Sequence, residues 1–276
     1  MSRVSTSLTG VVKKAEEQFS EASIPSPRLD AEVLLAYVLG VERSWLHAHG
    51  DEELQPESVE KFAQLVQRRL RREPIAYITG EKEFYGREFI ITPDVLIPRP
   101  ETEDLIDLAK EHYPQDARII DVGAGSGCVG ITLRLEIPKS TVTLADISEH
   151  ALFITKKNAK ALGAQVSYVK TDLLASFRDS SFDLIVANLP YVDSTWETSP
   201  ETDYEPKLAL YAENGGLALI YKLIEQSESV VSNSGLLFLE ADPEQHIQII
   251  KKARQHSFEP LEIRGYALCF TKLKQA

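Results

Sequence analysis

The fold is decided by one stretch of sequence, Ile119-Ile120-Asp121-Val122-Gly123-Ala124-Gly125-Ser126-Gly127-Cys128. The apolar run predicts a buried strand, and the glycines that follow predict a tight turn into a helix. Glycines also let a ligand approach the backbone closely. The spacing is G-x-G-x-G, and residues 125–130 also fit G-x-G-x-x-G, a pattern found in dinucleotide-binding proteins as well. We therefore expect a nucleoside site at this turn.

Two carboxylates near the turn narrow the choice of ligand. Asp146 ends the next predicted strand about twenty residues later, where a carboxylate can accept hydrogen bonds from ribose hydroxyls. Asp121 lies just before the glycines, where its charge suits a cationic amino-acid end better than a pyrophosphate. A third predicted strand ends at Asp172-Leu173, where the adenine would lie. These positions favour S-adenosylmethionine (SAM) over NAD.

A second motif, Asn188-Leu189-Pro190-Tyr191, follows the apolar run 182–187. The Asn188 amide offers a donor and an acceptor, and Pro190 pushes Leu189 into an extended conformation that directs the Leu189 carbonyl outward. Tyr191 supplies a flat apolar face. Together these four residues predict a small polar site for a planar –NH₂ group.

Helices and strands alternate from about residue 101 onward, which predicts a mostly parallel sheet covered by helices on both faces. Ligands bind such sheets at the carboxyl ends of the strands. The predicted helices are 101–112, 128–135, 150–162, 216–225 and 245–256. The predicted strands are 118–122, 141–145, 166–170, 184–187 and 236–240, with a final hairpin formed by 261–263 and 267–272.

The first part of the chain has a different pattern. Residues 1–79 carry apolar side chains at helical spacing and predict a helical bundle. Residues 80–98 change to period two around Gly86 and predict a β-hairpin linker. Residues 99–276 form the predicted ligand-binding domain. The basic run Arg68-Arg69-Leu70-Arg71-Arg72 is expected to be a solvated helix face, with a contact for an acidic partner as the alternative.

Charge and composition exclude several classes of protein. The 276 residues are 43% hydrophobic and carry a net charge of −12. Residues 1–80 have 10 basic and 12 acidic side chains, so −10 of that charge falls on residues 81–276, which disfavours direct nucleic-acid binding. No segment is apolar enough to span a membrane, the first residues lack a signal-peptide core, and two cysteines form no metal or disulfide framework. We expect a cytoplasmic monomer without a metal.

Taken in order along the chain, these motifs resemble the HemK/PrmC family, the SAM-dependent N5-glutamine methyltransferases of peptide chain release factors. The resemblance covers nearly the whole chain. It is carried by Ser26-Pro27-Arg28-Leu29-Asp30, Leu96-Ile97-Pro98-Arg99-Pro100-Glu101-Thr102-Glu103, the glycine-rich turn, Asn188-Leu189-Pro190-Tyr191 and Glu205-Pro206-Lys207-Leu208-Ala209-Leu210. Where the family has Asn-Pro-Pro-Tyr, this chain has Leu189 in place of the first proline.

The resemblance implies a class I SAM-dependent methyltransferase domain preceded by a small helical domain that helps to dock the release factor. The cofactor-binding residues would be Gly123, Ala124, Gly125, Ser126, Gly127, Asp121, Asp146, Asp172, Leu173 and Asn188, with Glu101 and Thr102 near the methionine end of SAM. Asn188 and the Leu189 carbonyl would hold the glutamine amide of the Gly-Gly-Gln motif, with Pro190 and Tyr191 beside them.

Two other classes of protein are compatible with the same motifs. An adenine amino-group methyltransferase acting on RNA or DNA could use the same polar site, but it would need a basic groove. A non-catalytic protein that binds SAM or a translation factor would not need the Asn188-Leu189-Pro190-Tyr191 site. Turnover on a release factor would separate these alternatives from the enzyme.

Overall fold

The computed structural model describes residues 7–112 and 116–274; the first residues, on which the expectation of no signal peptide rests, lie outside them. The chain divides into two compact units. The helical unit comprises residues 1–80 together with Ser199–Tyr204, and the sheet unit comprises Glu81–Thr198 and Glu205–Ala276. None of the described helices is long and apolar enough to cross a membrane.

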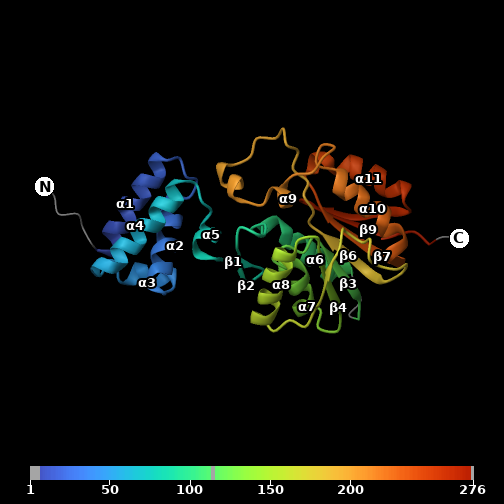
Figure 1. Cartoon of the computed structure of the whole chain (residues 1–276), viewed down its shortest axis with the longest axis horizontal. Helices are drawn as coiled ribbons and strands as arrows, with labels where there is room; N and C mark the ends of the chain where they lie inside the picture. Colours follow the sequence, from blue (N-terminus) through green and yellow to red (C-terminus); the bar gives the residue numbers. More distant parts are fainter. Residues whose placement is uncertain (1–6, 113–115, 275–276) are drawn as a thin grey trace. The chain divides into compact units, whose positions relative to one another are not determined.

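The helical unit has one apolar core, formed mainly by three helices that bury side chains such as Phe19, Leu35 and Phe62. Prolines occupy the first turns of two of these helices, where the missing N–H has no helical partner anyway. Two short helices, α3 and α5, were not predicted, because five or six residues are too few to show a helical period. The helices are α1 (Leu8–Glu21), α2 (Pro27–Leu39), α3 (Arg43–Ala48), α4 (Pro56–Leu70) and α5 (Ile75–Thr79) (Figure 1).

The basic run at the end of α4 is not simply a solvated face, so this expectation was wrong for Arg69. Arg69 is only 5% exposed and donates to Asp30 at 2.7 Å and to Glu201 at 3.0 Å. Burying a guanidinium requires such carboxylate partners. The network also explains why Ser199–Tyr204 belongs to this unit, because Glu201 accepts from Arg72 as well, at 3.2 Å.

The sheet unit begins with the predicted hairpin, formed by β1 (Glu81–Phe84) and β2 (Arg87–Ile90). Tyr85 and Gly86 both have positive φ, 51° and 69°, as a tight two-residue hairpin turn requires. Asn158 of the helix α8 (Glu149–Ala161) accepts from the Ile90 N–H at 2.7 Å and donates to the Ile90 carbonyl at 3.0 Å. The hairpin is therefore fixed to the body of this unit.

The main sheet has seven strands in the order β5-β4-β3-β6-β7-β9-β8. The five strands β5, β4, β3, β6 and β7 each lie parallel to their neighbours. Strand β9 pairs antiparallel with both β7 and β8. The predicted sheet, mostly parallel with a terminal antiparallel hairpin, is confirmed. The strands are β3 (Arg118–Val122), β4 (Thr141–Asp146), β5 (Ser167–Lys170), β6 (Phe182–Ala187), β7 (Val231–Glu240), β8 (Phe258–Arg264) and β9 (Ala267–Lys272).

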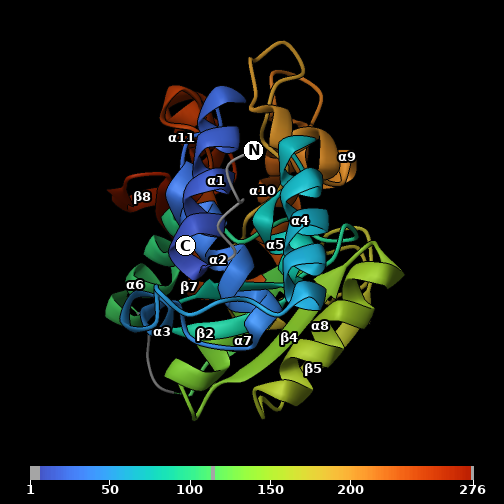
Figure 2. The same cartoon turned by 90° about the vertical axis from the view of Figure 1, so that its left-hand side faces the viewer.

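Helices cover both faces of this sheet. Figure 1 shows α10 and α11 on one side of it and α6, α7 and α8 on the other. In Figure 2, α8 runs beside β4 and β5 at the edge of the sheet. Buried side chains such as Ile185, Leu237 and Phe270 form the core beneath α10 and α11. The remaining helices are α6 (Glu103–His112), α7 (Cys128–Glu136), α9 (Lys207–Leu210), α10 (Ala218–Val230) and α11 (His246–Gln255), with short 3₁₀ turns at Pro100–Thr102, Pro200–Tyr204 and Pro243–Gln245.

Two predicted helix boundaries differ from the structure for clear reasons. The helix expected from residue 101 begins at Glu103, because Pro100–Thr102 forms a 3₁₀ turn. The helix expected from residue 216 begins at Ala218, since Gly215 and Gly216 have φ of 65° and 82°, in the left-handed region. It also runs further than expected, to Val230.

Candidate active site

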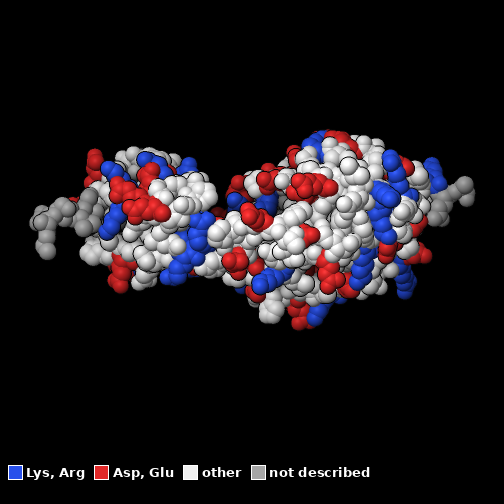
Figure 3. Space-filling view, turned by 90° about the horizontal axis from the view of Figure 1, so that it is seen from above, with Lys and Arg blue, Asp and Glu red and all other residues white. Residues whose placement is uncertain are grey.

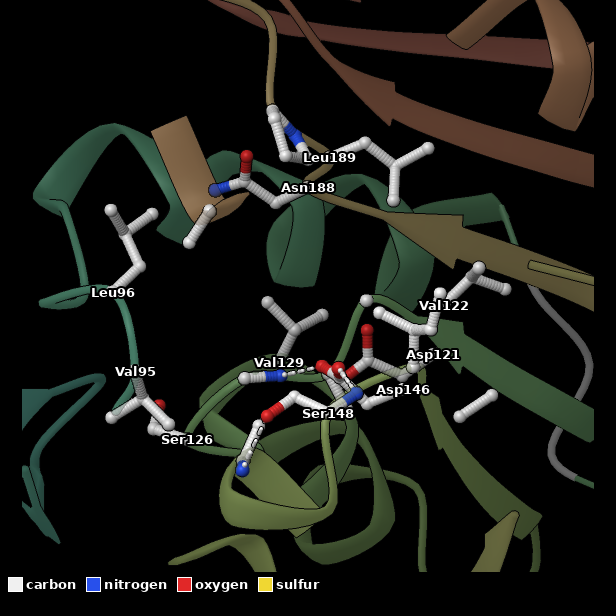
Figure 4. A pocket seen from close by; sticks show the side chains of 18 of the residues that line it. Val95, Leu96, Asp121, Val122, Ser126, Val129, Asp146, Ser148, Asn188 and Leu189 are labelled. Carbon is white, nitrogen blue, oxygen red and sulfur yellow. Dashed lines mark hydrogen bonds between the residues drawn. The ribbon is translucent and has the colours of Figure 1, made fainter. Parts of the chain in front are cut away.

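A cavity of about 220 Å³ lies at the carboxyl ends of β3, β4 and β6. This edge is where the strand order reverses, because β3 lies between β4 and β6. The cavity is lined by the glycine-rich turn, by acidic side chains at strand ends and by apolar side chains such as Val95, Val129 and Leu219. Figure 4 shows Asp121, Asp146 and Ser126 on one side and Asn188 with Leu189 on the other.

The glycine-rich turn is held closely against neighbouring backbone. The Gly123 and Ala124 N–H groups both donate to the Ala145 carbonyl, at 2.8 and 3.1 Å. Gly123 has a φ of 75°, and a Cβ added there would lie 2.8 Å from the Leu189 Cδ2 atom. Only glycine therefore fits this position without strain and without displacing Leu189.

Asp146 is oriented by two backbone donors. Its Oδ2 accepts from the Gly125 N–H at 2.9 Å, and its Oδ1 accepts from the Ser148 N–H at 2.8 Å. Burial raises the pKa of this carboxyl, while these backbone hydrogen bonds oppose the rise. Each carboxylate oxygen keeps a further lone pair. The side chain can therefore accept from two adjacent hydroxyl groups of a ribose.

Asp121 is almost fully buried, with 2% of its surface exposed, and its Oδ2 accepts from the Gly130 N–H at 2.8 Å. Burial raises the pKa of this carboxyl to about 7, and the charge of Asp146 adds to the rise. A nearby cation would reverse this shift by stabilising the ionised form. The site is thus suited to a ligand that brings a positive charge into the cavity.

The opposite side of the cavity is formed by the residues that follow β6. The Asn188 side chain donates from Nδ2 to the Thr102 Oγ1 atom at 3.1 Å. Leu189 is 4% exposed, and its side chain packs in the core beside Gly123. The Leu189 side chain therefore serves packing, which leaves its backbone carbonyl as the group that can contact a ligand.

Tyr191 is held in place from two directions. Its hydroxyl donates to the Glu240 Oε1 atom at 3.2 Å, and its backbone carbonyl accepts from the Gln245 side chain at 2.8 Å. Its ring packs against the apolar core. These contacts fix the position of Tyr191, which lies between the turn after β6 and the apolar core.

Glu240, at the end of β7, is a buried acid that sequence reasoning missed. It is 1% exposed, and burial raises its pKa to about 7, while the polar groups of Thr102, Tyr191 and Asn188 oppose the rise. A signal for it was present, because a carboxylate ends a predicted apolar strand here as Asp146 does.

A second buried acid, Glu205, joins two walls of the cavity. It is 4% exposed and accepts from the Ile97 N–H at 3.2 Å and from Arg99 at 2.5 Å. Pro98 and Arg99 line one wall, and Pro206, Leu208 and Ala209 line another. Leu208 is 66% exposed, so it presents an apolar surface at the rim.

Most of the predicted site residues meet at this cavity. Among those predicted residues, all within the described part of the chain, three do not line it: Glu101 is exposed, Gly127 caps α7 and Tyr191 lies beneath the turn. Asp172 lies at the rim, where it accepts from Lys222 at 2.5 Å. The residues that line it are Thr102, Asp121, Gly123, Ala124, Gly125, Ser126, Asp146, Asp172, Leu173, Asn188, Leu189 and Pro190.

The strand order of the parallel sheet reverses at β3, beside the glycine-rich turn. Together with the carboxylates at the strand ends and the asparagine after β6, this arrangement defines a class I SAM-dependent methyltransferase. Two family models match the chain, the PrmC N-terminal domain over residues 11–80 and the methyltransferase small domain over residues 102–202. The release factor glutamine methyltransferase of Koribacter versatilis is 39% identical over 240 residues, covering 83% of this chain and 86% of that protein. The chain belongs to the release factor glutamine methyltransferase family.

A second relative supports the family, and two solved structures support the fold. The release factor glutamine methyltransferase of Neisseria gonorrhoeae is 37% identical over 244 residues, covering 86% of this chain and 88% of that protein. A methyltransferase structure from Pyrococcus furiosus has a TM-score of 0.56 and 16% sequence identity; the match covers 70% of this chain and 92% of the Pyrococcus chain. The Thermus thermophilus 16S rRNA N2 G1207 methyltransferase, solved with AdoMet and guanosine, matches 70% of this chain and 50% of its own with a TM-score of 0.54 at 16% identity. These two structures support the fold.

Proposed function

We propose that this enzyme transfers a methyl group from SAM to the side-chain amide nitrogen (N5) of the glutamine in the Gly-Gly-Gln motif of class I release factors. The observation that carries this substrate assignment is the orientation of Asn188. Because Nδ2 of Asn188 donates to Thr102, its Oδ1 remains available as an acceptor. With the Leu189 carbonyl it offers two acceptors, and a primary amide has two N–H donors.

The residues of the cavity fit SAM. Asp146 would hold the ribose hydroxyls, the glycine-rich turn would lie against the nucleoside, and Asp172 with Leu173 would flank the adenine. Asp121 would face the cationic amino-acid end, with Thr102 and Glu101 near it. When bound, SAM supplies an electrophilic methyl group.

The chain itself would act mainly by positioning. The lone pair of an amide nitrogen is delocalised into its carbonyl, so the nitrogen is a poor nucleophile. Hydrogen bonds to Asn188 Oδ1 and the Leu189 carbonyl would hold both N–H groups and favour a pyramidal nitrogen. Fixed acceptors that need no rearrangement are an efficient way to lower such a barrier. The methylated nitrogen is far more acidic than a free amide, so its proton can pass to water.

The helical unit is proposed to dock the body of the release factor. Support comes from the match of its residues 11–80 to the PrmC N-terminal domain and from two exposed apolar side chains on α2, Leu29 and Tyr37, which are 44% and 46% exposed. A substrate that works on ribosomes would place the enzyme in the cytoplasm. Figure 3 shows acidic and basic side chains interspersed over one face of the described residues, which suits a protein partner better than a phosphate backbone.

Methyl transfer from radiolabelled SAM tests this proposal. We expect label on a release factor with an intact Gly-Gly-Gln motif, and none when its glutamine is changed to glutamate, which has the same length and branching but no side-chain nitrogen. Ribosomal RNA serves as the competing acceptor. If adenine in RNA is labelled and the release factor is not, the proposal is wrong and the enzyme is a nucleic-acid methyltransferase.

A further inference from the structure

The Asn188 carboxamide can sit in its site in two ways that differ by a half-turn. One presents Oδ1 to the substrate, and the other presents Nδ2. The substrate amide brings N–H donors, so Nδ2 facing it would set donor against donor. The enzyme therefore needs a device that selects one orientation, and this need rests on the proposed function.

Thr102 is the first part of such a device. Its Oγ1 accepts from Asn188 Nδ2 at 3.1 Å, and the side chain is 1% exposed. A hydroxyl has one proton and two lone pairs. While its oxygen accepts from Asn188, its proton has to go to another acceptor. The direction of the Asn188 hydrogen bond therefore depends on where the Thr102 proton goes.

Glu240 supplies the acceptor. Its Oε1 accepts from the Tyr191 hydroxyl at 3.2 Å, and Thr102, Asn188 and the Glu101 carboxylate are also polar neighbours. Its Oε2 is buried without a hydrogen-bond partner of good geometry. A buried carboxylate oxygen without a donor is costly, and the carboxylate only accepts when it is ionised, which is the form that the Thr102 hydroxyl favours. The Thr102 proton is the donor at hand for Oε2.

We propose that Thr102 and Glu240 are positioning residues that fix the orientation of the Asn188 carboxamide through a one-way chain of hydrogen bonds. Glu240 accepts from Thr102, Thr102 accepts from Asn188 Nδ2, and Asn188 Oδ1 is left facing the substrate amide. Tyr191 donates to the other oxygen of Glu240 and holds the carboxylate in place. Neither Thr102 nor Glu240 needs to touch the reacting atoms.

Near-isosteric substitutions test the chain. Thr102→Val removes the hydroxyl, and Glu240→Gln replaces one acceptor oxygen with a donor, which allows the chain to reverse. We expect each to lower kcat about 10- to 100-fold, the size of effect seen when a reacting group is misplaced by about 1 Å. In Glu240→Gln the KM for SAM should stay within about twofold, because Glu240 does not line the cavity and the glycine-rich turn and Asp146 are untouched. Thr102→Ser, which keeps the hydroxyl, should retain most of the activity.

A readout of hydrogen-bond polarity separates this role from simple packing. A release factor whose Gly-Gly-Gln glutamine is changed to glutamate offers acceptors in place of donors. Wild-type enzyme should be inhibited by it less well than by a methylated glutamine product, whereas Glu240→Gln, with Asn188 free to turn, should lose that preference. The double variant Thr102→Val/Glu240→Gln should be no slower than the slower single variant, because both break one chain.

The outcomes distinguish this inference from the proposed function. Wild-type enzyme that fails to methylate the release factor would refute the proposed function itself. If the wild-type enzyme is active and both Thr102→Val and Glu240→Gln keep a kcat near that of the wild type, the proposed chain of hydrogen bonds is wrong and the proposed function stands. A Thr102→Ser variant as slow as Thr102→Val would also overturn the proposed chain of hydrogen bonds, since the hydroxyl would then be irrelevant. Thermal unfolding serves as the folding control for every variant.

Discussion

The two sides of the cavity are built in different ways. The cofactor side, formed by Asp121, Asp146 and the glycine-rich turn, is held by backbone N–H donors from neighbouring turns. The amide side is held by side chains far apart in sequence, since Asn188 contacts Thr102 and Tyr191 contacts Glu240. Backbone-held groups bind a ligand in one geometry, whereas a side-chain network can be tuned one residue at a time. Substitutions on the two sides should therefore affect different kinetic constants.

The largest effect is expected at Asn188. Asn188→Ala should lower kcat about 10²–10³-fold, the usual cost of removing one preorganised group that acts in the transition state. SAM affinity should stay nearly unchanged, because the main proposed contacts to SAM come from Asp146 and the glycine-rich turn on the other side. Steady-state kinetics and calorimetry measure the two quantities, with the exposed Asn233→Ala as the matched control. A large loss of SAM affinity would contradict the division between the two sides.

Asp146 should show the reverse behaviour. Asp146→Ala should weaken SAM binding by about 1–3 kcal/mol, the range for losing hydrogen bonds to a charged group. At saturating SAM, kcat should fall much less than it does in Asn188→Ala. Asp179→Ala, which removes an exposed carboxylate, is the control. Unchanged SAM affinity in calorimetry would remove Asp146 from the cofactor site.

Asp121 should link stability to pH. Because burial raises its pKa from 3.8 to about 7, the folded protein without SAM binds this proton more tightly than the unfolded chain does. The contribution of Asp121 to the free energy of unfolding therefore falls as pH rises from about 4 to 7 and stays low above that range. The Asp121→Asn variant lacks this titrating group. The free energy of unfolding of the variant, relative to that of the wild type, should therefore rise by at least about 1 kcal/mol between pH 4 and 8. Denaturant titrations at both pH values measure the difference, and a constant difference would refute it.

The helical unit should affect recognition and leave the chemistry unchanged. Leu29→Ala together with Tyr37→Ala should raise the KM for intact release factor about fivefold, close to 1 kcal/mol of interface energy. Methylation of a short Gly-Gly-Gln peptide should not change, because both side chains lie on α2, outside the sheet unit. Equal losses on both substrates would show that this surface does not dock the release factor.

The smallest effect is expected at Leu189. Leu189→Pro creates Asn-Pro-Pro-Tyr and keeps the backbone carbonyl, so kcat should change by less than about threefold, or about 0.7 kcal/mol. The lost packing against Gly123 should lower the melting temperature slightly. Loss of release-factor methylation in this variant would mean that the Leu189 side chain, and not only its carbonyl, shapes the amide side.

The sequence predicted the cofactor side well because its parts are local. The strand, the glycine-rich turn and the carboxylate that ends the next strand follow one another at short spacing, and a parallel sheet brings such strand ends to one edge. The amide side could be predicted only for Asn188-Leu189-Pro190-Tyr191. Thr102 was placed by resemblance alone, and its contact with Asn188 spans 86 residues.

Glu205 was missed because nothing in the local pattern marks a buried acid, and Glu240 was missed because its place at a strand end does not show which side chains it meets. Their partners, Tyr191 for Glu240 and Arg99 for Glu205, come from elements 49 and 106 residues away. Arg69 was misjudged for the same reason, since its carboxylate partner Glu201 lies 132 residues further on. Periodicity identifies which elements form, but it does not identify which polar side chains meet between them.

In the proposed reaction the methyl group reaches an amide nitrogen held by Asn188 and the Leu189 carbonyl. Tandem mass spectrometry of the release factor after reaction with the enzyme and SAM tests it directly, because fragmentation locates the added methyl group. We predict methylation on the side-chain nitrogen of the Gly-Gly-Gln glutamine, present with wild-type enzyme and nearly absent with Asn188→Ala. A methyl group on any other atom of the release factor, or an unmodified glutamine, would contradict the account.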